Sequence, residues 1–152
     1  MTTLAEAVRD DEAAKIERLE GAMLALPQVD CRTEHFFGPG LYIRQITIPA
    51  GALVVGHAHK TEHVNIMLKG RVTIATPEGV ATLSAPLVFI APPGRKVALA
   101  HEETVWQNVH ATDERDLDKL EELFVEKSDT WNETHALVER LRAHELSDRG
   151  EL

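Results

Sequence analysis

The stretch Gly51–Gly70, GALVVGHAHKTEHVNIMLKG, decides the fold of this chain. It places three of the eight histidines, His57, His59 and His63, inside an apolar, strand-like run. Residues two apart lie on one face of an extended strand, so His57 and His59 are expected to face the same way. The gap before His63 is long enough for a tight hairpin that returns it beside this pair. Because neutral imidazole binds divalent transition metals well, the spacing predicts a metal pocket.

Short runs rich in β-branched residues surround this stretch on both sides. Turn signals such as Pro77-Glu78-Gly79 and Pro92-Pro93-Gly94 separate them. Many short strands at this spacing predict a β-sandwich or barrel. The expected strands are Leu41–Ile48, Leu53–His59, His63–Lys69, Val72–Ala75, Val80–Leu83, Leu87–Ala91, Lys96–Ala100 and Thr104–His110.

Both ends of the chain show helical periodicity. Apolar residues recur at helical spacing from Thr3 to Leu26, and Pro27 ends that helix. Further helices are expected over Asp116–Val125 and Thr130–Leu146. The pattern divides the chain into an N-terminal helix (residues 1–26), a β-barrel (residues 27–112) and a C-terminal helical segment (residues 113–152).

The composition is typical of one globular domain. A chain of 152 residues is long enough to bury a core. The net charge of -9, from 25 acidic and 16 basic residues, argues against a nucleic-acid partner. The single cysteine, Cys31, excludes an intramolecular disulfide. No apolar run reaches transmembrane length and Met1–Glu20 lacks a signal-peptide pattern, so we expect a cytoplasmic protein without a membrane partner.

Gly51–Gly70 resembles the first motif of the cupin family, G-x5-H-x-H-x3,4-E-x6-G, at every spacing, with His63 in the Glu position. Pro92-Pro93-Gly94 is similar to the P-x-G core of the second cupin motif. The histidine expected three residues after that glycine is Val97, and the asparagine expected four residues later is His101. A wider resemblance, over Leu26 to Phe124, is to small single-domain cupins, many of them encoded by phages. It includes the stretches Leu26-Pro27-Gln28-Val29-Asp30-Cys31, Ile48-Pro49-Ala50-Gly51, His59-Lys60-Thr61-Glu62-His63 and Ala100-His101-Glu102-Glu103-Thr104-Val105-Trp106.

The resemblance implies a mainly β fold, a cupin jelly-roll barrel with α-helices at both ends. For a phage-encoded protein the expected compartment is the host cytoplasm. His57, His59 and His63 are then the predicted metal ligands. Three neutral imidazoles suit Fe(II), Mn(II), Ni(II) and Zn(II) and leave coordination positions open. The competing reading is a degenerate cupin whose histidines are merely hydrogen-bonded residues of the lumen.

The fourth ligand position is open at this point. If Glu102-Glu103 forms a two-residue hairpin turn, Val97 pairs with Asn108 and Arg95 with His110. Val97 cannot bind metal. Asn108, or His110 after a slip in register, could approach the site instead.

Other lumen residues follow from the alternation of strand faces. His63, Asn65 and Met67 share one face, and the predicted ligand-binding residues are Asn65, Met67, Trp106 and Asn108. No catalytic residue is identified. Glu62 and His101 are the candidates for a general base, although Glu62 falls on the opposite face in the simple register and His101 is more typical of a solvated hairpin tip.

The opposite face of the strand over His63–Lys69 is fully aliphatic, with Val64, Ile66 and Leu68. A second subunit or the chain's own helices must cover it, and we expect a homodimer. The leading functional hypothesis is a small metal-binding cupin with an oxygenase-like or isomerase-like reaction on a small molecule. A non-catalytic small-molecule-binding protein and a phage accessory or assembly protein are the alternatives, and whether the protein is an enzyme is left open.

Overall fold

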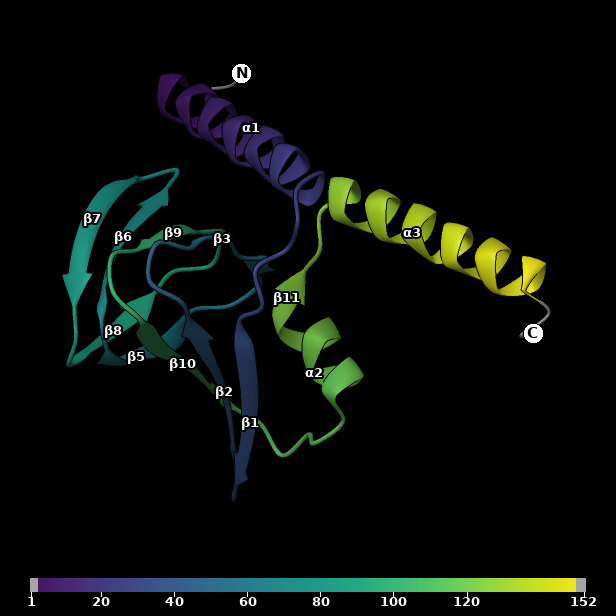
Figure 1. Cartoon of the computed structure of the whole chain (residues 1–152). Coiled ribbons are helices and arrows are strands. Elements are labelled where there is room, and N and C mark those ends of the chain that lie inside the picture. The colour runs from purple at the N-terminus through teal and green to yellow at the C-terminus, as the bar shows by residue number, and fades with distance from the viewer. Residues whose placement is uncertain (1–2, 150–152) are drawn as a thin grey trace.

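The computed structural model describes residues 3–149, which form a mainly β fold with helices at both ends (Figure 1). The helices are α1 (Leu4–Leu24), α2 (Leu117–Phe124) and α3 (Asp129–Asp148). The strands are β1 (Arg32–Gly38), β2 (Leu41–Ile48), β3 (Leu53–Val55), β4 (Ala58–His59), β5 (His63–Lys69), β6 (Arg71–Thr76), β7 (Gly79–Ser84), β8 (Leu87–Ala91), β9 (Val97–Ala100), β10 (Thr104–Ala111) and β11 (Val125–Glu126).

The strands form two antiparallel sheets and one short pair. Sheet A has the order β1-β2-β10-β5-β8, sheet B has the order β3-β9-β6-β7, and β11 pairs with β4. Without β1, β4 and β11, eight strands remain, four in each sheet, and every connection between consecutive strands crosses from one sheet to the other except the β6–β7 hairpin of sheet B. This is the double-sheet jelly roll, the architecture that cupins share with capsid and lectin domains. The predicted fold class, a mainly β jelly roll with N-terminal and C-terminal helices, is confirmed.

Three strands, β2, β5 and β8, have the predicted bounds. The continuous strand expected over Leu53–His59 is wrong, because the chain leaves sheet B after Val55. Gly56 N–H still donates to the Lys96 carbonyl at 3.0 Å, but β4 then pairs with β11 instead of continuing the sheet. The strand β1 was not expected from the sequence. The division into three domains stays a prediction.

The hairpin expected at Glu102-Glu103 is also wrong. Strand β9 pairs with β3 and β6 in sheet B, whereas β10 pairs with β2 and β5 in sheet A. The connection therefore crosses from one sheet to the other. The physical reason is burial: Ala98 and Ala100 on β9 and Trp106 on β10 all pack into the core between the sheets.

The hydrophobic core lies between the inner faces of the two sheets. Its buried residues are Ile48, Ala52, Met67, Val72, Ala98, Ala100 and Trp106. Side chains alternate along each strand, so these residues fix which face of every strand points inward. On β5 the inward residues are His63, Asn65 and Met67, as the sequence predicts.

The two motif glycines lie at tight turns. Gly51 has φ +82° and Gly70 has φ +99°, a left-handed conformation that favours glycine. A Cβ atom at Gly70 would collide with Thr104 Oγ1 and lie 2.6 Å from the Glu103 carbonyl, whereas one at Gly51 would meet nothing within 4 Å. Gly70 therefore allows the turn after β5 to pass close to the start of β10.

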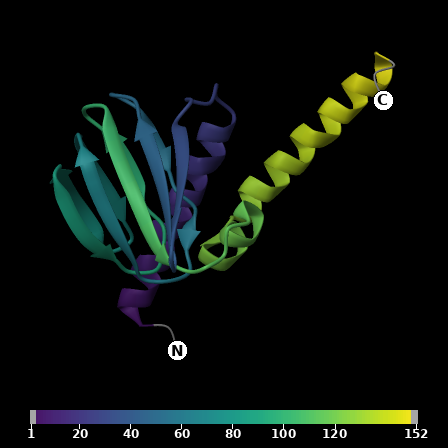
Figure 2. The same cartoon turned by 90° about the horizontal axis from the view of Figure 1, so that it is seen from below.

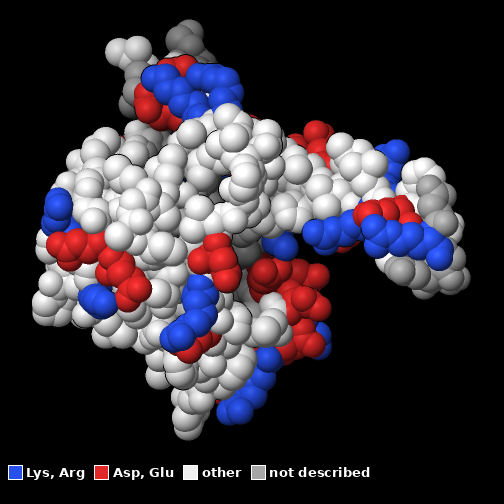
Figure 3. Space-filling model, viewed as in Figure 1, with Lys and Arg blue, Asp and Glu red and all other residues white. Residues whose placement is uncertain are grey.

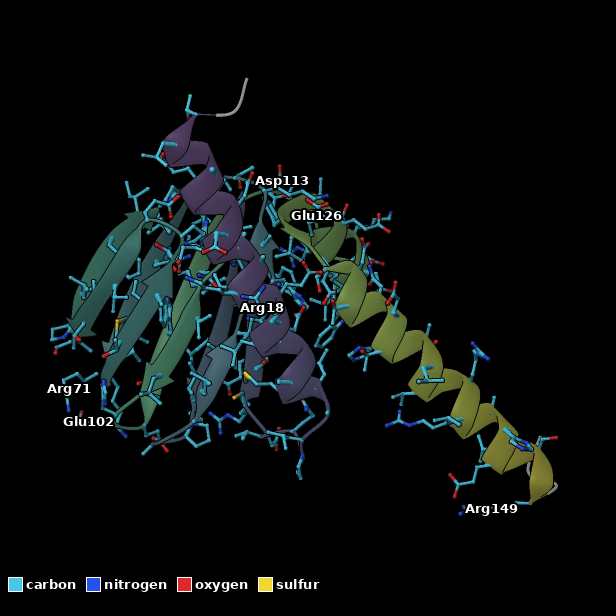
Figure 4. The ribbon with its side chains drawn as sticks, turned by 90° about the horizontal axis from the view of Figure 1, so that it is seen from above. Arg18, Arg71, Glu102, Asp113, Glu126 and Arg149 are labelled. Carbon is cyan, nitrogen blue, oxygen red and sulfur yellow. The ribbon has the colours of Figure 1, made fainter. Side chains whose placement is uncertain are left out.

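The helices attach to the β body near one end. Helix α1 lies over the side of sheet B, and α3 projects away from the strands (Figures 1, 2 and 4). The carboxylate of Glu20 on α1, only 3% exposed, accepts hydrogen bonds from Arg95 Nη2 and from Ser128 Oγ, the N-cap of α3. This buried network fastens both long helices to the loop before β9. Within residues 3–149, none of the helices combines the length and the hydropathy that a membrane span requires.

Candidate functional site

A row of aromatic rings crosses the inner face of sheet A. Tyr42 on β2 pairs with His110 on β10, and the pairing of Val109 with Val64 places His110 beside His63 on β5. The ring centroids of Tyr42 and His110 are 6.2 Å apart, and those of His110 and His63 are 5.4 Å apart. Both pairs are stacked, so the register of three strands builds this row.

His59 completes the cluster from the short strand β4. Its ring stacks on His63 at 4.0 Å between centroids with 14° between the planes, and it lies 6.1 Å from the ring of His110. The His59 backbone exchanges hydrogen bonds with Gly94, the glycine of the P-P-G turn, at 2.8 and 2.9 Å. The histidine cluster of this protein is therefore His59, His63 and His110.

The structure brings His59 and His63 together, as predicted, but it places His57 elsewhere. The His57 ring packs edge-on against Trp131 at the start of α3, with 4.6 Å between ring centroids. His57 and His59 do not share a face because the chain is irregular between β3 and β4, where the alternation of an extended strand does not hold.

Three buried ring nitrogens have no hydrogen-bond partner in the described residues: His57 Nδ1, His59 Nδ1 and His63 Nε2. His63 is the most informative of the three. Its Nδ1 lies 3.0 Å from the Thr61 carbonyl, which can only accept, so Nδ1 carries the proton and Nε2 carries a free lone pair. A backbone carbonyl that fixes the tautomer in this way is the usual support of a metal-ligating histidine.

All four histidines are held in the neutral form. Burial is the main cause of this, because it lowers the pKa of all four imidazoles. The pKa of His59 falls to about 3 and that of His110 to about 4. Repulsion from His63 lowers the pKa of His59 and His110 further. Neutral imidazole is the form that ligates a metal, so the donor chemistry fits a transition-metal ion.

The orientation of the rings fits a metal less well. Within residues 3–149, no three His, Cys, Asp or Glu side chains are arranged to hold a metal ion as they stand. The nearly parallel planes of His59 and His63 explain this, because ligating rings normally radiate from a common ion. The donor set is present, and the rings would have to turn before they could share an ion.

Three hydrogen-bonded side chains, those of Asn65, Trp106 and Asn108, lie next to the cluster. Asn65, fully buried, accepts at Oδ1 from Trp106 Nε1 at 2.9 Å and from Asn108 Nδ2 at 2.7 Å, and its own Nδ2 donates to the His63 carbonyl at 3.3 Å. Met67 and Trp106 belong to the hydrophobic core. Asn108 is half-buried in the row next to the cluster, and a ligand-binding role for the four residues stays a prediction.

Neither candidate base lies in the cluster. Glu62 is exposed on the turn before β5. His101 is exposed at the opposite end of β10 from His110, where its Nε2 lies 2.7 Å from Thr73 Oγ1.

Nearer the cluster, His35 Nδ1 and Tyr42 Oη share a short hydrogen bond of 2.6 Å. Burial is the main cause that raises the pKa of Tyr42 and lowers that of His35, so both groups are neutral at pH 7.

The segment that contains α2 and β11 covers the cluster. Phe124 stacks on His110 with 4.1 Å between ring centroids. The backbone N–H of Lys60 donates to the Phe124 carbonyl at 2.9 Å, and its Nζ donates to the Glu122 carbonyl at 2.6 Å. Acidic side chains gather over α2 on the outer surface (Figure 3). The C-terminal segment therefore closes the site with an aromatic ring.

Val97, the residue in the second-motif histidine position, does not face the cluster. Ala98 and Ala100 point into the core, so Val97 and Leu99 lie on the outer face of sheet B. The pairing of Val97 with Asn108, which the hairpin would have given, is wrong because β9 and β10 belong to different sheets. By the same alternation Lys96 faces inward, where its charge acts on His59 and His63. Sequence reasoning missed Lys96, because the face of β9 depends on its pairing with sheet B.

No protein-family model and no curated protein matches the sequence. Similar solved structures include a cupin domain from Bordetella pertussis, with 16% identity over 57% of this chain and 98% of that chain and a TM-score of 0.45. The cupin domain of Cnp3 from Schizosaccharomyces pombe has 22% identity over 57% of this chain and 71% of that chain, with a TM-score of 0.44. KdgF from Halomonas sp. has 16% identity over 61% of this chain and 88% of that chain, with a TM-score of 0.48. At these values the likeness carries no inference about activity or ligand.

Proposed function

We propose that this protein is a small metal-binding cupin that holds one divalent transition-metal ion at His59, His63 and His110. The observation that carries the proposal is the His63 ring. Its Nδ1–H is committed to the Thr61 carbonyl, and its Nε2 lone pair is buried without a partner next to His59. A buried, unsatisfied acceptor is costly unless something occupies it, and a metal ion would do so. His57 stays a candidate ligand because its Nδ1 is also unpartnered.

Three neutral nitrogen ligands suit Fe(II), Mn(II), Ni(II) or Zn(II). Such an ion, when bound, acts as a Lewis acid on a carbonyl or enolate. The protein itself supplies a closed site, with Phe124 over His110, and a proton-bearing pair in Tyr42 and His35. An oxygenase-like or isomerase-like reaction on a small molecule is the leading activity, with Tyr42 stacked on His110 of the cluster.

Metal content tests this proposal directly. Protein stripped with chelator, desalted and reconstituted separately with each of the four ions should retain close to one ion per chain after gel filtration. The double variant His59→Ala/His63→Ala should lose the ion, and His101→Ala, at the far end of the barrel, should keep it. Retention of far less than one ion per chain by the parent protein, for all four ions, would overturn the proposal.

A non-catalytic binding protein is the second candidate, and the closed cover over the cluster favours it. In that case a small molecule should co-purify with the protein and stay bound after chelator treatment, and native mass spectrometry would detect it.

A role in assembly as a phage accessory protein is the third candidate. The exposed aliphatic face of sheet A favours a homodimer, since Val88 and Ile90 on the edge strand β8 are 65% and 63% exposed.

A further inference from the structure

Arg44 brings a positive charge to the histidine cluster from sheet A. It pairs with His35 on one side and Asn108 on the other, in the row next to Tyr42 and His110 on the inner face. Its charge lowers the pKa of both His59 and His110. Arg44 is exposed, and within residues 3–149 it has neither an ion pair nor a hydrogen-bonding partner for its guanidinium.

Lys96 brings a second positive charge from the other sheet. It immediately precedes β9, faces inward and is half-buried, and its charge lowers the pKa of His59 and His63. Burial lowers the pKa of the Lys96 ammonium itself. No carboxylate of the described part of the chain pairs with it. His59 therefore lies under the influence of two cations that approach from opposite sheets.

The carboxylates that surround the cluster do not neutralise these cations. Glu121, which acts electrostatically on Tyr42 and His57, pairs with Lys127 at 2.9 Å. Glu20 is bound to Arg95 and Ser128. His63 occupies the position that is glutamate in the first cupin motif. A protein with a net charge of -9 thus keeps one half-buried and one exposed cation, neither paired with a carboxylate of the described residues, near its neutral imidazoles.

Such a site favours an anion. The half-buried ammonium of Lys96 has no partner within residues 3–149, which is unusual because desolvation of a cation is costly, and an oxyanion beside it would offset that cost. The planar guanidinium of Arg44 suits a carboxylate or phosphate group, and Lys96 supplies a point charge. We propose that the histidine cluster binds a small oxyanion, a carboxylate- or phosphate-bearing molecule held between Arg44 and Lys96. This inference deepens the proposed function by naming the class of ligand.

The test uses malonate and inorganic phosphate as probes of the full-length, metal-free protein. Titrations followed by NMR of the histidine rings should show saturable binding of at least one of the two anions. Arg44→Gln and Lys96→Met should each raise its Kd by about tenfold. The matched control is Arg71→Gln: Arg71 is an exposed arginine at the end of the strands beside Glu102, away from Glu126 (Figure 4), and its loss should leave the Kd unchanged.

Three results would overturn the inference. They are no binding of either anion, equal binding of the uncharged malonamide, and equal loss of affinity in Arg71→Gln. Arg44 is exposed, so its variant should fold, and circular dichroism checks the fold of Lys96→Met. Parallel titrations with Fe(II), Mn(II), Ni(II) and Zn(II), each without anion, separate the two proposals. Anion binding with no binding of any of the four ions would refute the metal site only, and binding of an ion without anion binding would refute the anion site only.

Discussion

The imidazole rings of His63 and His110 stack on adjacent strands with 5.4 Å between their centroids. Both residues are buried, with 4% and 6% of their surface exposed. Two neighbouring bases in a dry environment cannot both be protonated at low cost, and His63 accordingly lowers the pKa of His110. We therefore expect this pair, together with His59, to make the stability of the protein depend on pH.

The first prediction concerns stability against pH. The pKa of His59 is about 3 and that of His110 about 4 in the folded state, against 6.5 in an unfolded chain. The unfolded state therefore binds more protons below pH 6.5, and the free energy of unfolding should fall as the pH drops through this window. Each histidine contributes up to about 1.4 kcal/mol per pH unit. Urea unfolding between about pH 7 and about pH 5 measures the slope.

His110→Phe isolates the contribution of one histidine. The phenyl ring keeps the stacking with Tyr42 and Phe124 but cannot titrate, so the slope of stability against pH should become shallower. His135→Phe, on the exposed surface of α3, should leave the slope unchanged. An identical slope in His110→Phe and the parent protein would contradict the prediction.

The second prediction concerns the turn after β5. Gly70→Ala should lower the free energy of unfolding by more than the ~1–2 kcal/mol that a left-handed alanine costs, because its Cβ also meets Thr104 Oγ1 and the Glu103 carbonyl. Gly51→Ala has a similar φ with open space around it and should lose about 1–2 kcal/mol only. Equal losses in the two variants, measured by chemical denaturation, would rule out the close approach at Gly70.

The third prediction concerns the buried network at Glu20. Glu20→Ala leaves Arg95 and the N-cap of α3 without their shared carboxylate, and should cost about 3–5 kcal/mol of unfolding free energy. The control, Glu12→Ala, removes an exposed partner of Lys15 on the same helix and should cost less than about 1 kcal/mol. A loss at Glu20 no larger than that at Glu12 would show that the network does not anchor α1.

The fourth prediction concerns the outer face of sheet A. The cross-strand pair Val64–Ile90 is aliphatic, and no helix covers Ile90, which is 63% exposed. We expect light scattering at micromolar concentration to give twice the chain mass of 16.9 kDa. Ile90→Lys should give a monomer, while Val80→Lys, 73% exposed on sheet B, should stay dimeric. A parent protein of single-chain mass would contradict the homodimer.

Local spacing, together with the cupin resemblance, was sufficient to predict the fold and two of the three histidines of the cluster. The bounds of β5 follow from residue alternation, and the short gap between His59 and His63 requires a turn that brings them together. His110 was predicted to approach the site only after a slip in register, and Lys96 was not predicted at all, because their positions depend on which sheets β9 and β10 join. A hairpin was the simplest local solution at Glu102-Glu103. The connection crosses between the sheets instead, because this buries the inner faces of β9 and β10, which is a non-local effect.

The position of the segment that contains α2 and β11 over the cluster could not be predicted from the sequence either. The helix that ends at Phe124 was expected from its periodicity, but stacking on His110 depends on β11 pairing with β4. A two-residue strand leaves no pattern in the sequence. The irregular chain at His57 breaks the alternation that paired it with His59, since no strand hydrogen bonds fix that residue.

The most direct test of the central claim is a titration of chelator-stripped, desalted protein with cobalt(II), read by the visible absorption of the bound ion. The account predicts a saturable absorption with an end point near one ion per chain. It predicts that His63→Ala and His110→Ala abolish this absorption while His101→Ala retains it. Absence of a saturable signal in the parent protein, or the same signal in His63→Ala, would contradict the claim that His59, His63 and His110 form a metal site.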